Sequence, residues 1–319
     1  MNKSNYEDLP IIMQEYLFYM ASIKNRSAHT IKEYYYDLRN IFRFLKRDKF
    51  NIKTDNLNEI DIKDIDINFI KTLKLNDFYN YLYYLTDERK SKPVSRARKI
   101  STIKSFFNYL CSKEKLLDIN PCVDLETPKL GKRIPKYLNL EEAHALLQSV
   151  EGKHKSRDYA MLTLFLNCGL RLSELVNINL SHIRNDILTV IGKGNKERSI
   201  YLNKVCISAI SSYLMDRPID GVIDKDALFL SSRYKRIGRR TVEVIVKKHI
   251  IMAGLDPKKY SPHKLRHTAA TLMHKHGNVD IRALQQILGH ESISTTEIYT
   301  HLDSEEVRKA LDSNPLNKL

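Results

Sequence analysis

The sequence predicts a mainly α-helical protein with one small β-sheet in its C-terminal half. Apolar residues recur at helical spacing in several long segments of the 319-residue chain. By contrast, residues 187–191 and 199–202 form two short strand-like runs on either side of a glycine-rich turn. The length is enough for two ordinary domains, and a hydrophobic content of 42% supports ordinary cores.

Residues 1–127 predict an N-terminal helical bundle. Helices are expected near residues 8–23, from Thr30 onward, at 67–86 and at about 94–112. The second of these has apolar or aromatic residues at helical spacing, namely Ile31, Tyr34, Leu38, Ile41, Phe42 and Leu45. The fourth is surrounded by cations, among them Arg96, Lys99 and Lys104. These three side chains are candidates for DNA contact, although a solvated charged face would have the same composition.

A basic linker is expected at residues 128–138. The chain carries a net charge of +15, and residues 129–138 alone contribute +4, as much as residues 1–128 together. Pro121, Pro128 and Pro135 discourage a helix and favour an extended segment. We interpret this segment as a strap that touches a phosphate backbone through Lys132 and Arg133, and a merely solvated loop is the alternative.

Residues 139–319 predict a mixed α and β domain. Asn139 is a plausible cap for its first helix. A helix at 157–167 leads into Gly169-Leu170-Arg171. The two predicted strands flank Gly192-Lys193-Gly194-Asn195, which is typical of a hairpin. From about residue 241 the pattern is helical again.

Three helix boundaries near the C-terminus place polar side chains at helix ends. Ser261 and Pro262 begin a helix that puts His263 and Arg266 on one face near its positive end. Asp280 is the expected cap of the next helix, which ends at Gly289, so that His290 lies just beyond it. Residues 294–297 fit a capping box and place Tyr299 in the second turn of a short helix.

Six of these side chains suit cleavage of a phosphodiester without a metal. They are Arg171, Lys193, His263, Arg266, His290 and Tyr299. Two guanidiniums can bind non-bridging phosphate oxygens in bidentate fashion, and a tyrosine can attack phosphorus and retain it as an ester. His263 and His267 are also spaced like a zinc pair, but Lys264 stands where the metalloprotease pattern requires glutamate.

These motifs, in this order, resemble the tyrosine recombinases, and most closely the Xer-like simple recombinases. The resemblance rests on the segments Gly169–Leu175, Ile191–Arg198, Ser261–His267 and Leu288–His301. It extends to the N-terminal half, where Ser27-Ala28-His29-Thr30 precedes Tyr34 and Asp37-Leu38, as in the family's DNA-clamping domain. Taken alone, each motif would be weak evidence.

The resemblance implies a role for each residue. Tyr299 would be the nucleophile that forms a 3′-phosphotyrosyl link, and Arg171 and Arg266 would hold the scissile phosphate. Lys193 would protonate the departing 5′ oxygen, and His263 would transfer a proton with the tyrosine. His290 would donate a hydrogen bond to a phosphate oxygen, and Glu174 would support Arg171.

The resemblance also implies an architecture and partners. A SAM-like N-terminal domain and an α+β catalytic domain would form a C-shaped clamp on duplex DNA. Four protomers, as a homotetramer or a heterotetramer with a second recombinase, would exchange strands through a Holliday junction. The tail from 302 to 319 would dock on a neighbouring subunit. The compact two-domain layout favours dimer resolution as the role. Integration or inversion by a mobile element, a type IB topoisomerase and an inactive DNA-binding regulator are the alternatives.

The other expectations concern ligands and location. No metal and no cofactor are expected. Cys111, Cys122, Cys168 and Cys206 have no C-x-x-C spacing, so they are expected to be reduced and mostly buried. No apolar run is long enough to span a membrane and no signal peptide is evident, so a cytoplasmic location is expected.

Overall fold

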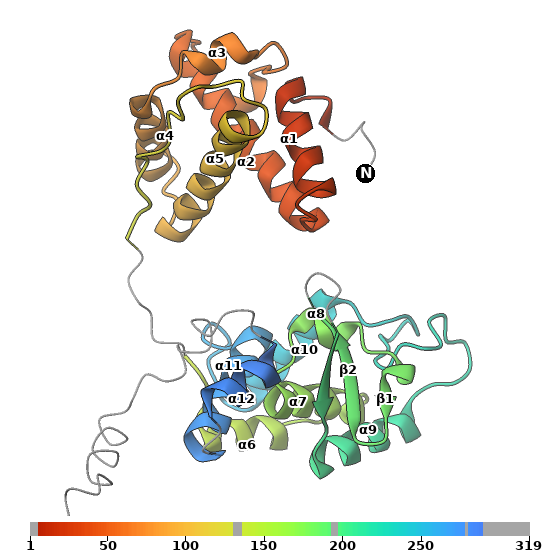
Figure 1. The fold of residues 1–319 in the computed structure, drawn as a ribbon. Coiled ribbons are helices and arrows are strands. Elements are labelled where there is room, and N and C mark those ends of the chain that lie inside the picture. Colours follow the sequence, from red (N-terminus) through yellow and green to blue (C-terminus); the bar gives the residue numbers. More distant parts are fainter. Residues whose placement is uncertain (1–5, 130–135, 193–196, 278–279, 290–319) are drawn as a thin grey trace, which may run out of the picture. The chain divides into compact units, whose positions relative to one another are not determined.

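The protein is described by a computed structural model that covers residues 6–129, 136–192, 197–277 and 280–289. The chain divides into two compact units, Met1–Lys132 and Arg133–Leu319. Both are mainly helical, and the C-terminal unit also contains a small sheet, as the sequence predicts (Figure 1).

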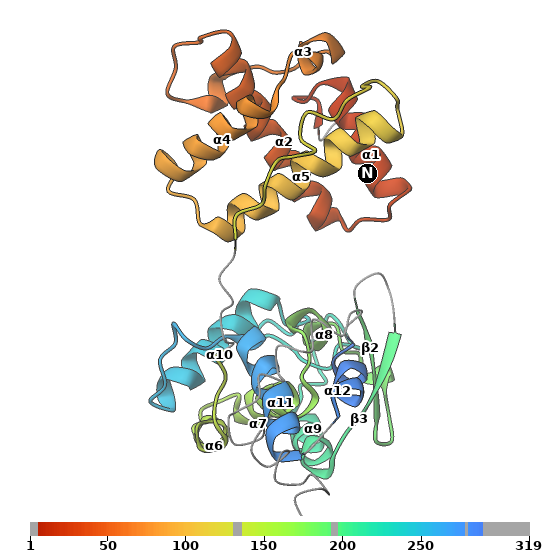
Figure 2. The same ribbon diagram turned by 60° about the vertical axis from the view of Figure 1, so that its left-hand side comes forward.

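The N-terminal unit is a bundle of helices around an aromatic core (Figures 1 and 2). Its elements are α1 (Ile11–Ser22), α2 (Ala28–Lys49), the 3-10 helix η2 (Leu57–Glu59), α3 (Ile67–Lys71), α4 (Leu75–Asp87) and α5 (Pro93–Ser112). Phe106 on α5 packs edge-on against Phe42 on α2, with ring centroids 5.7 Å apart. Ser27 caps α2 by accepting a hydrogen bond from the Thr30 N–H at 3.2 Å.

The single helix expected at 67–86 is two helices, α3 and α4. The chain leaves α3 at Thr72 and buries Leu73 in the core. The Asp77 carboxylate then accepts a hydrogen bond from the Lys74 N–H at 2.7 Å, which starts α4. Apolar spacing continues across the break, and for that reason the sequence pattern does not reveal it.

A buried carboxylate ties α5 to α2. Asp37, on α2, is only 2% exposed and accepts two hydrogen bonds from the Arg98 guanidinium at 2.5 and 2.9 Å. It also accepts hydrogen bonds from Lys99 at 2.7 Å and from the Thr102 hydroxyl at 3.0 Å. Because its buried charge is fully partnered, Asp37 fixes how the basic helix α5 lies on the bundle.

In the C-terminal unit, other helices pack around α7, most of whose residues are buried. Its helices are α6 (Leu140–Gln148), α7 (Lys155–Cys168), α8 (Leu172–Val176), η3 (Leu180–His182), α9 (Lys204–Asp216), α10 (Arg239–Met252), α11 (Pro262–Gly277) and α12 (Ile281–Leu288). Helix α7 packs against α6, α9 and α11, and α12 packs on α11 (Figure 1). Helix α9 was not predicted from the sequence pattern.

The sheet lies to one side of this helical core. It is antiparallel, in the order β1 (Ile183–Arg184), β2 (Ile187–Ile191) and β3 (Glu197–Tyr201). The pairing of Leu188 with Ile200 and of Ile191 with Glu197 fixes its register. The two predicted strands are therefore confirmed, and the short β1 was not predicted.

The helix caps predicted at Asn139, Asp280 and Gly289 are present, and the capping box predicted at residues 294–297 lies outside the described residues. Asn139 and Glu142 form a reciprocal capping box, with the Glu142 N–H donating to the Asn139 side chain at 2.7 Å. The Asp280 carboxylate accepts from the Arg282 N–H at 3.0 Å and caps α12. Gly289 ends α12 with a φ of +63°, a left-handed conformation that favours glycine.

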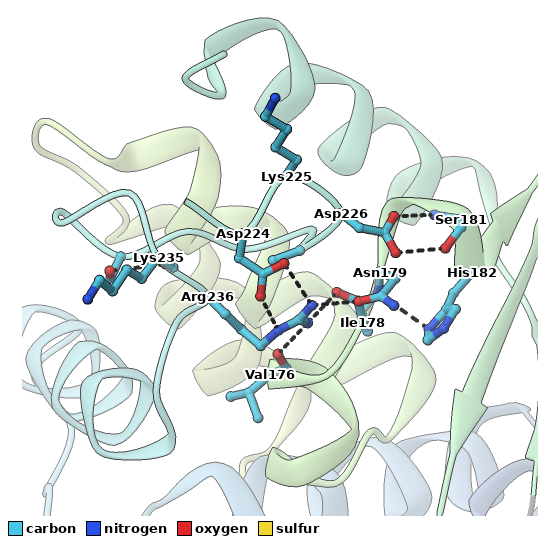
Figure 3. Close-up of polar contacts among 12 residues, drawn as sticks. Val176, Ile178, Asn179, Ser181, His182, Asp224, Lys225, Asp226, Lys235 and Arg236 are labelled. Atoms are coloured by element: carbon cyan, nitrogen blue, oxygen red, sulfur yellow. Dashed lines mark hydrogen bonds and ion pairs between the residues drawn. The ribbon is translucent and has the colours of Figure 1, made fainter. Parts of the chain in front are cut away.

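The long connection between α9 and α10 is held by polar contacts to the segment after α8 (Figure 3). Arg236 forms an ion pair with Asp224 at 2.8 Å and donates to the carbonyl oxygens of Val176 and Ile178, both at 3.2 Å. The Asp226 carboxylate accepts hydrogen bonds from the Ser181 N–H and hydroxyl. These contacts attach the connection between α9 and α10 to the end of α8 and to the residues that follow it.

All four cysteines are free thiols, and Cys122, Cys168 and Cys206 are buried. The thiols of Cys168 and Cys206 lie 3.8 Å apart in the core of the C-terminal unit. Within the described ranges, no helix is both long and apolar enough to cross a membrane.

Candidate active site

The site begins where α7 ends. Gly169 adopts a left-handed conformation with a φ of +58°, and this conformation lets the chain turn sharply out of α7. Leu170 is buried, and Arg171 follows as the residue that begins α8. Its N–H donates to Glu174 Oε2 at 2.8 Å, and its guanidinium Nη1 donates to Glu174 Oε1 at 2.7 Å. The short helix α8 therefore holds Arg171 and Glu174 together.

Arg266 reaches the same place from the first turns of α11. Its Nη1 donates to the Gly169 carbonyl oxygen at 2.6 Å and lies 3.8 Å from Glu174 Oε2. Its Nη2 donates to the Leu288 carbonyl oxygen at 2.6 Å. Whereas the Arg266 residue is only 2% exposed, the Arg171 side chain is 34% exposed. Arg171 is thus the more accessible of the two guanidiniums to an incoming anion.

A third guanidinium, Arg198 of β3, completes the cluster. Its Nη2 donates to Glu174 Oε2 at 2.9 Å, and its Nη1 donates to the Ile287 carbonyl oxygen. Arg198 belongs to the motif Ile191–Arg198, but the motif alone predicts no role for it. The signal was present in the strand pattern, because Arg198 and the buried Ile200 share the inward face of β3. An arginine on an inward face requires an anionic partner.

The end of α12 is bound by all three arginines. Its last carbonyl groups, those of Ile287, Leu288 and Gly289, each accept a hydrogen bond from a different guanidinium. The donors are Arg198, Arg266 and Arg171 respectively, and the Arg171 bond is 2.9 Å long. The C-terminal end of a helix carries partial negative charge, so cations are favourable there.

The electrostatics of the cluster centre on Glu174, whose side chain is fully buried. Burial alone would raise its pKa, but the charge of Arg198 and the hydrogen bonds and charge of Arg171 outweigh burial and hold the pKa below its ordinary value. Glu174 is therefore ionised at neutral pH. Three guanidiniums around one carboxylate leave an excess of positive charge, which suits binding of a phosphate.

His263 lies one turn before Arg266 on α11. Partial burial of its ring, followed by the nearby charges of Arg266, Lys264 and Arg171, lowers its pKa below the ordinary value. A neutral imidazole therefore predominates at pH 7 and can accept a proton. Its Nε2 lies 3.0 Å from His267 Nε2. Within the described ranges, no group of three potential metal ligands includes this pair.

The predicted DNA-contact residues of α5 lie in the other unit. Arg96 Nη1 donates to the Ser91 carbonyl oxygen at 2.5 Å, and Lys104 Nζ donates to the Val123 carbonyl oxygen at 3.3 Å. The ammonium group of Lys99 is paired with Asp37, and its side chain is only 15% exposed. The structure brings together Arg171, Glu174, His263 and Arg266 within the C-terminal unit, and the three cations of α5 belong to the N-terminal unit.

Five other predicted residues lie outside the described parts of the chain. They are Lys132, Arg133, Lys193, His290 and Tyr299. Two of them are sequence neighbours of described site elements. Lys193 comes two residues after the end of β2, and His290 directly follows Gly289, whose carbonyl oxygen binds Arg171.

Comparison with known proteins identifies the class. Residues 136–306 match the model of the phage integrase family, and residues 13–114 match the model of the phage integrase N-terminal SAM-like domain. The chain therefore belongs to the phage integrase family of tyrosine recombinases, as its motifs suggest.

Individual relatives narrow the assignment. The chain is 56% identical over 310 residues to tyrosine recombinase XerC of Caldanaerobacter subterraneus subsp. tengcongensis, a match that covers 97% of this chain and 88% of that protein. It is 36% identical to tyrosine recombinase XerD of Proteus mirabilis, with coverage of 96% and 93%. Among solved structures, the fold is similar to that of XerH site-specific recombinase in a post-cleavage complex with palindromic difH DNA. The TM-score is 0.72 and the sequence identity is 20%, and the match covers 98% of this chain and 84% of that one. Within its family the chain is an Xer-like site-specific tyrosine recombinase, an enzyme that breaks and rejoins DNA.

Replacing Glu174 with glutamine should lower the free energy of unfolding of the C-terminal unit by about 3–5 kcal/mol at neutral pH, because three guanidiniums lose the charge they share. The folded-state pKa of Glu174 lies below the ordinary value of 4.5. Its stabilising contribution is therefore complete above that value and is lost as the pH falls through the lower folded-state pKa. The deficit of the variant should accordingly shrink in acid, as measured by urea titrations followed by circular dichroism.

Glu141→Gln is the matched control, because Glu141 is an exposed glutamate in the first turn of α6. It should change the free energy of unfolding by no more than about 0.5 kcal/mol. If Glu174→Gln lowers the free energy of unfolding equally at neutral and acidic pH, the electrostatic role of Glu174 is contradicted.

Proposed function

We propose that this enzyme cuts one strand of duplex DNA by attack of Tyr299 on a phosphodiester. The products would be a 3′-phosphotyrosyl link and a free 5′ hydroxyl. Rejoining to a second duplex would follow through a Holliday junction. The observation that carries the proposal is the cluster of Arg171, Arg198 and Arg266 around Glu174, because it gathers cations where a phosphate can reach Arg171. The ester retains the bond energy, so no nucleotide cofactor enters the scheme.

Each catalytic residue is assigned one role. Arg171 and Arg266 bind the non-bridging oxygens and stabilise the charge that develops on them in the transition state. Lys193 protonates the leaving 5′ oxygen, and His290 donates a hydrogen bond to a phosphate oxygen. His263, neutral at pH 7, exchanges a proton with Tyr299. A positioned proton donor or acceptor contributes about 10²–10⁴-fold to the rate.

The biological role we propose is resolution of DNA dimers, and the XerC and XerD names of the relatives support it. Integration or inversion by a mobile element is the alternative, since the same chemistry serves both. We also propose that the two units clamp duplex DNA and that four protomers assemble on two sites. The tetramer would contain either this chain alone or this chain with a second recombinase.

Tyr299→Phe should abolish the covalent complex with DNA and leave DNA binding unchanged, because it removes only the nucleophilic oxygen. The substrate is a nicked duplex from which cleavage releases a short fragment, so that rejoining is prevented. Its sequence is obtained by sequencing genomic fragments that the wild-type enzyme captures covalently. Denaturing gels measure the complex, and fluorescence anisotropy measures binding.

The same substrate separates the alternatives. Tyr83→Phe, which alters an exposed tyrosine on α4, is the control and should form the complex normally. A covalent complex that persists in Tyr299→Phe would refute the assignment of the nucleophile. Cleavage of every sequence, with relaxation of supercoiled DNA, would instead indicate a topoisomerase. Failure of the wild type to form any complex would indicate a regulator.

The rate of complex formation should fall in acid, because protonation of His263 removes its capacity to accept a proton. Since the pKa of His263 is lowered, the fall should occur at a pH below 6.5, the ordinary pKa of histidine. Lys264→Gln removes one of the cations that lower it, so the decline should begin at a higher pH. Single-turnover rates across the acidic range test this, with DNA binding measured at each pH, and superimposable profiles would contradict it.

Substituting glutamine for Lys132 and Arg133 together should weaken binding to all DNA sequences. We propose that this segment contacts the phosphate backbone, so each lost contact should reduce the slope of log affinity against log salt by about 0.9. Anisotropy titrations at several salt concentrations measure the slope. Lys258→Gln with Lys259→Gln, at a described turn before α11, is a control of equal charge. An unchanged slope in the strap variant would remove the strap from the interface.

A further inference from the structure

Arg198 makes contacts that go beyond those of an ordinary buried ion pair. Its side chain is 14% exposed and links three elements that are distant in sequence. It extends from β3, donates to Glu174 on α8 at 2.9 Å, and donates to the Ile287 carbonyl oxygen at the end of α12. The same Glu174 oxygen accepts the N–H of Arg171 at 2.8 Å. Arg198 therefore contacts the carboxylate that holds Arg171, and the Arg198 side chain is less exposed than that of Arg171.

The backbone of Gly289 is packed directly on Arg198. A Cβ at Gly289 would lie 2.7 Å from the Cδ atom and 3.0 Å from the Nε atom of Arg198, closer than packed atoms approach. The left-handed φ of +63° at Gly289 also favours glycine there. The Gly289 carbonyl oxygen in turn accepts from Arg171 at 2.9 Å. Arg198 thus borders both groups that bind the Arg171 guanidinium.

We propose that Arg198 is a positioning residue for DNA cleavage, acting through Glu174 and the end of α12 to set the orientation of the Arg171 guanidinium. This inference rests on the proposed function. Arg171 has one anchor on each side, the Glu174 carboxylate and the Gly289 carbonyl oxygen. Arg198 fixes both anchors, so its loss would leave Arg171 bound to groups that can shift. A displacement of about 1 Å at a reacting centre can cost about 10²-fold in rate.

Lysine cannot replace Arg198 in this role. The guanidinium is a planar fork whose two Nη atoms bind two acceptors on different elements. A single ammonium group keeps the charge but is a compact point donor on a flexible chain. Arg198→Lys should therefore preserve the charge of the cluster and lose its geometry.

Arg198→Lys should bind the recombination site as the wild type does but form the covalent complex about 10²-fold more slowly in single turnover. Arg236→Lys is the matched control, since Arg236 also joins a carboxylate to backbone carbonyl groups but lies in the connection between α9 and α10 (Figure 3). Thermal melts should give similar losses of stability for the two variants, and only Arg198→Lys should lose rate. Equal rates in the two variants would overturn the proposal.

A second substrate distinguishes positioning from general support of the fold. A methylphosphonate at the scissile position lacks one negatively charged non-bridging oxygen, which is the feature that Arg171 stabilises. The ratio of wild-type to Arg198→Lys rates should therefore shrink on this substrate, as it should for Arg171→Lys. An unchanged ratio would overturn the proposal, because a defect of folding would reduce cleavage of both substrates alike. If the wild type forms no covalent complex with either substrate, the proposed function itself fails, and this inference fails with it.

Discussion

The buried charge of Glu174 is the constraint on which the C-terminal unit depends. A carboxylate without solvent is stable only when cations and hydrogen-bond donors surround it. Arg171 and Arg198 supply these directly, and Arg266 lies within 4 Å. Because the arginines come from the turn after α7, from β3 and from α11, satisfying one carboxylate fixes the relative positions of three parts of the chain. Neutralisation of this buried acid therefore also brings together Arg171 and Arg266, the two proposed ligands of the phosphate.

Helix ends supply the second half of the site. Gly169 ends α7 and Gly289 ends α12, both in the left-handed conformation. Each of these turns directs a carbonyl oxygen at a guanidinium, Gly169 at Arg266 and Gly289 at Arg171. Negative helix ends and a carboxylate together hold the arginines in place before any phosphate arrives. In the mechanism that we propose, such preorganisation means that little reorganisation is needed when charge develops in the transition state.

The N-terminal unit also contains a buried carboxylate that is surrounded by hydrogen-bond donors. Asp37 is as deeply buried as Glu174 and is partnered by Arg98, Lys99 and Thr102. There the carboxylate joins two helices of a bundle and sets how the basic helix α5 is presented. The ammonium group of Lys99 is consequently directed at a protein carboxylate, whereas the Arg98 side chain remains 43% exposed. A cation count along a helix does not distinguish these two situations.

Features that depend on local chemistry could be predicted from the amino-acid sequence alone. The strand pair around residues 192–195, the caps at Asn139 and Asp280, and the helix end at Gly289 follow from side chains acting on backbone groups a few residues away. Arg171, Glu174, His263 and Arg266 were found because they lie in motifs that resemble those of a family. The folded structure was needed to show that Arg198 shares Glu174 with Arg171 and that Lys99 is paired with Asp37. It also shows that the carbonyl groups of Ile287, Leu288 and Gly289, at the end of α12, each accept from a different arginine. These contacts join residues far apart in the chain, and a buried charge selects its partner by position after folding, which local sequence patterns do not encode.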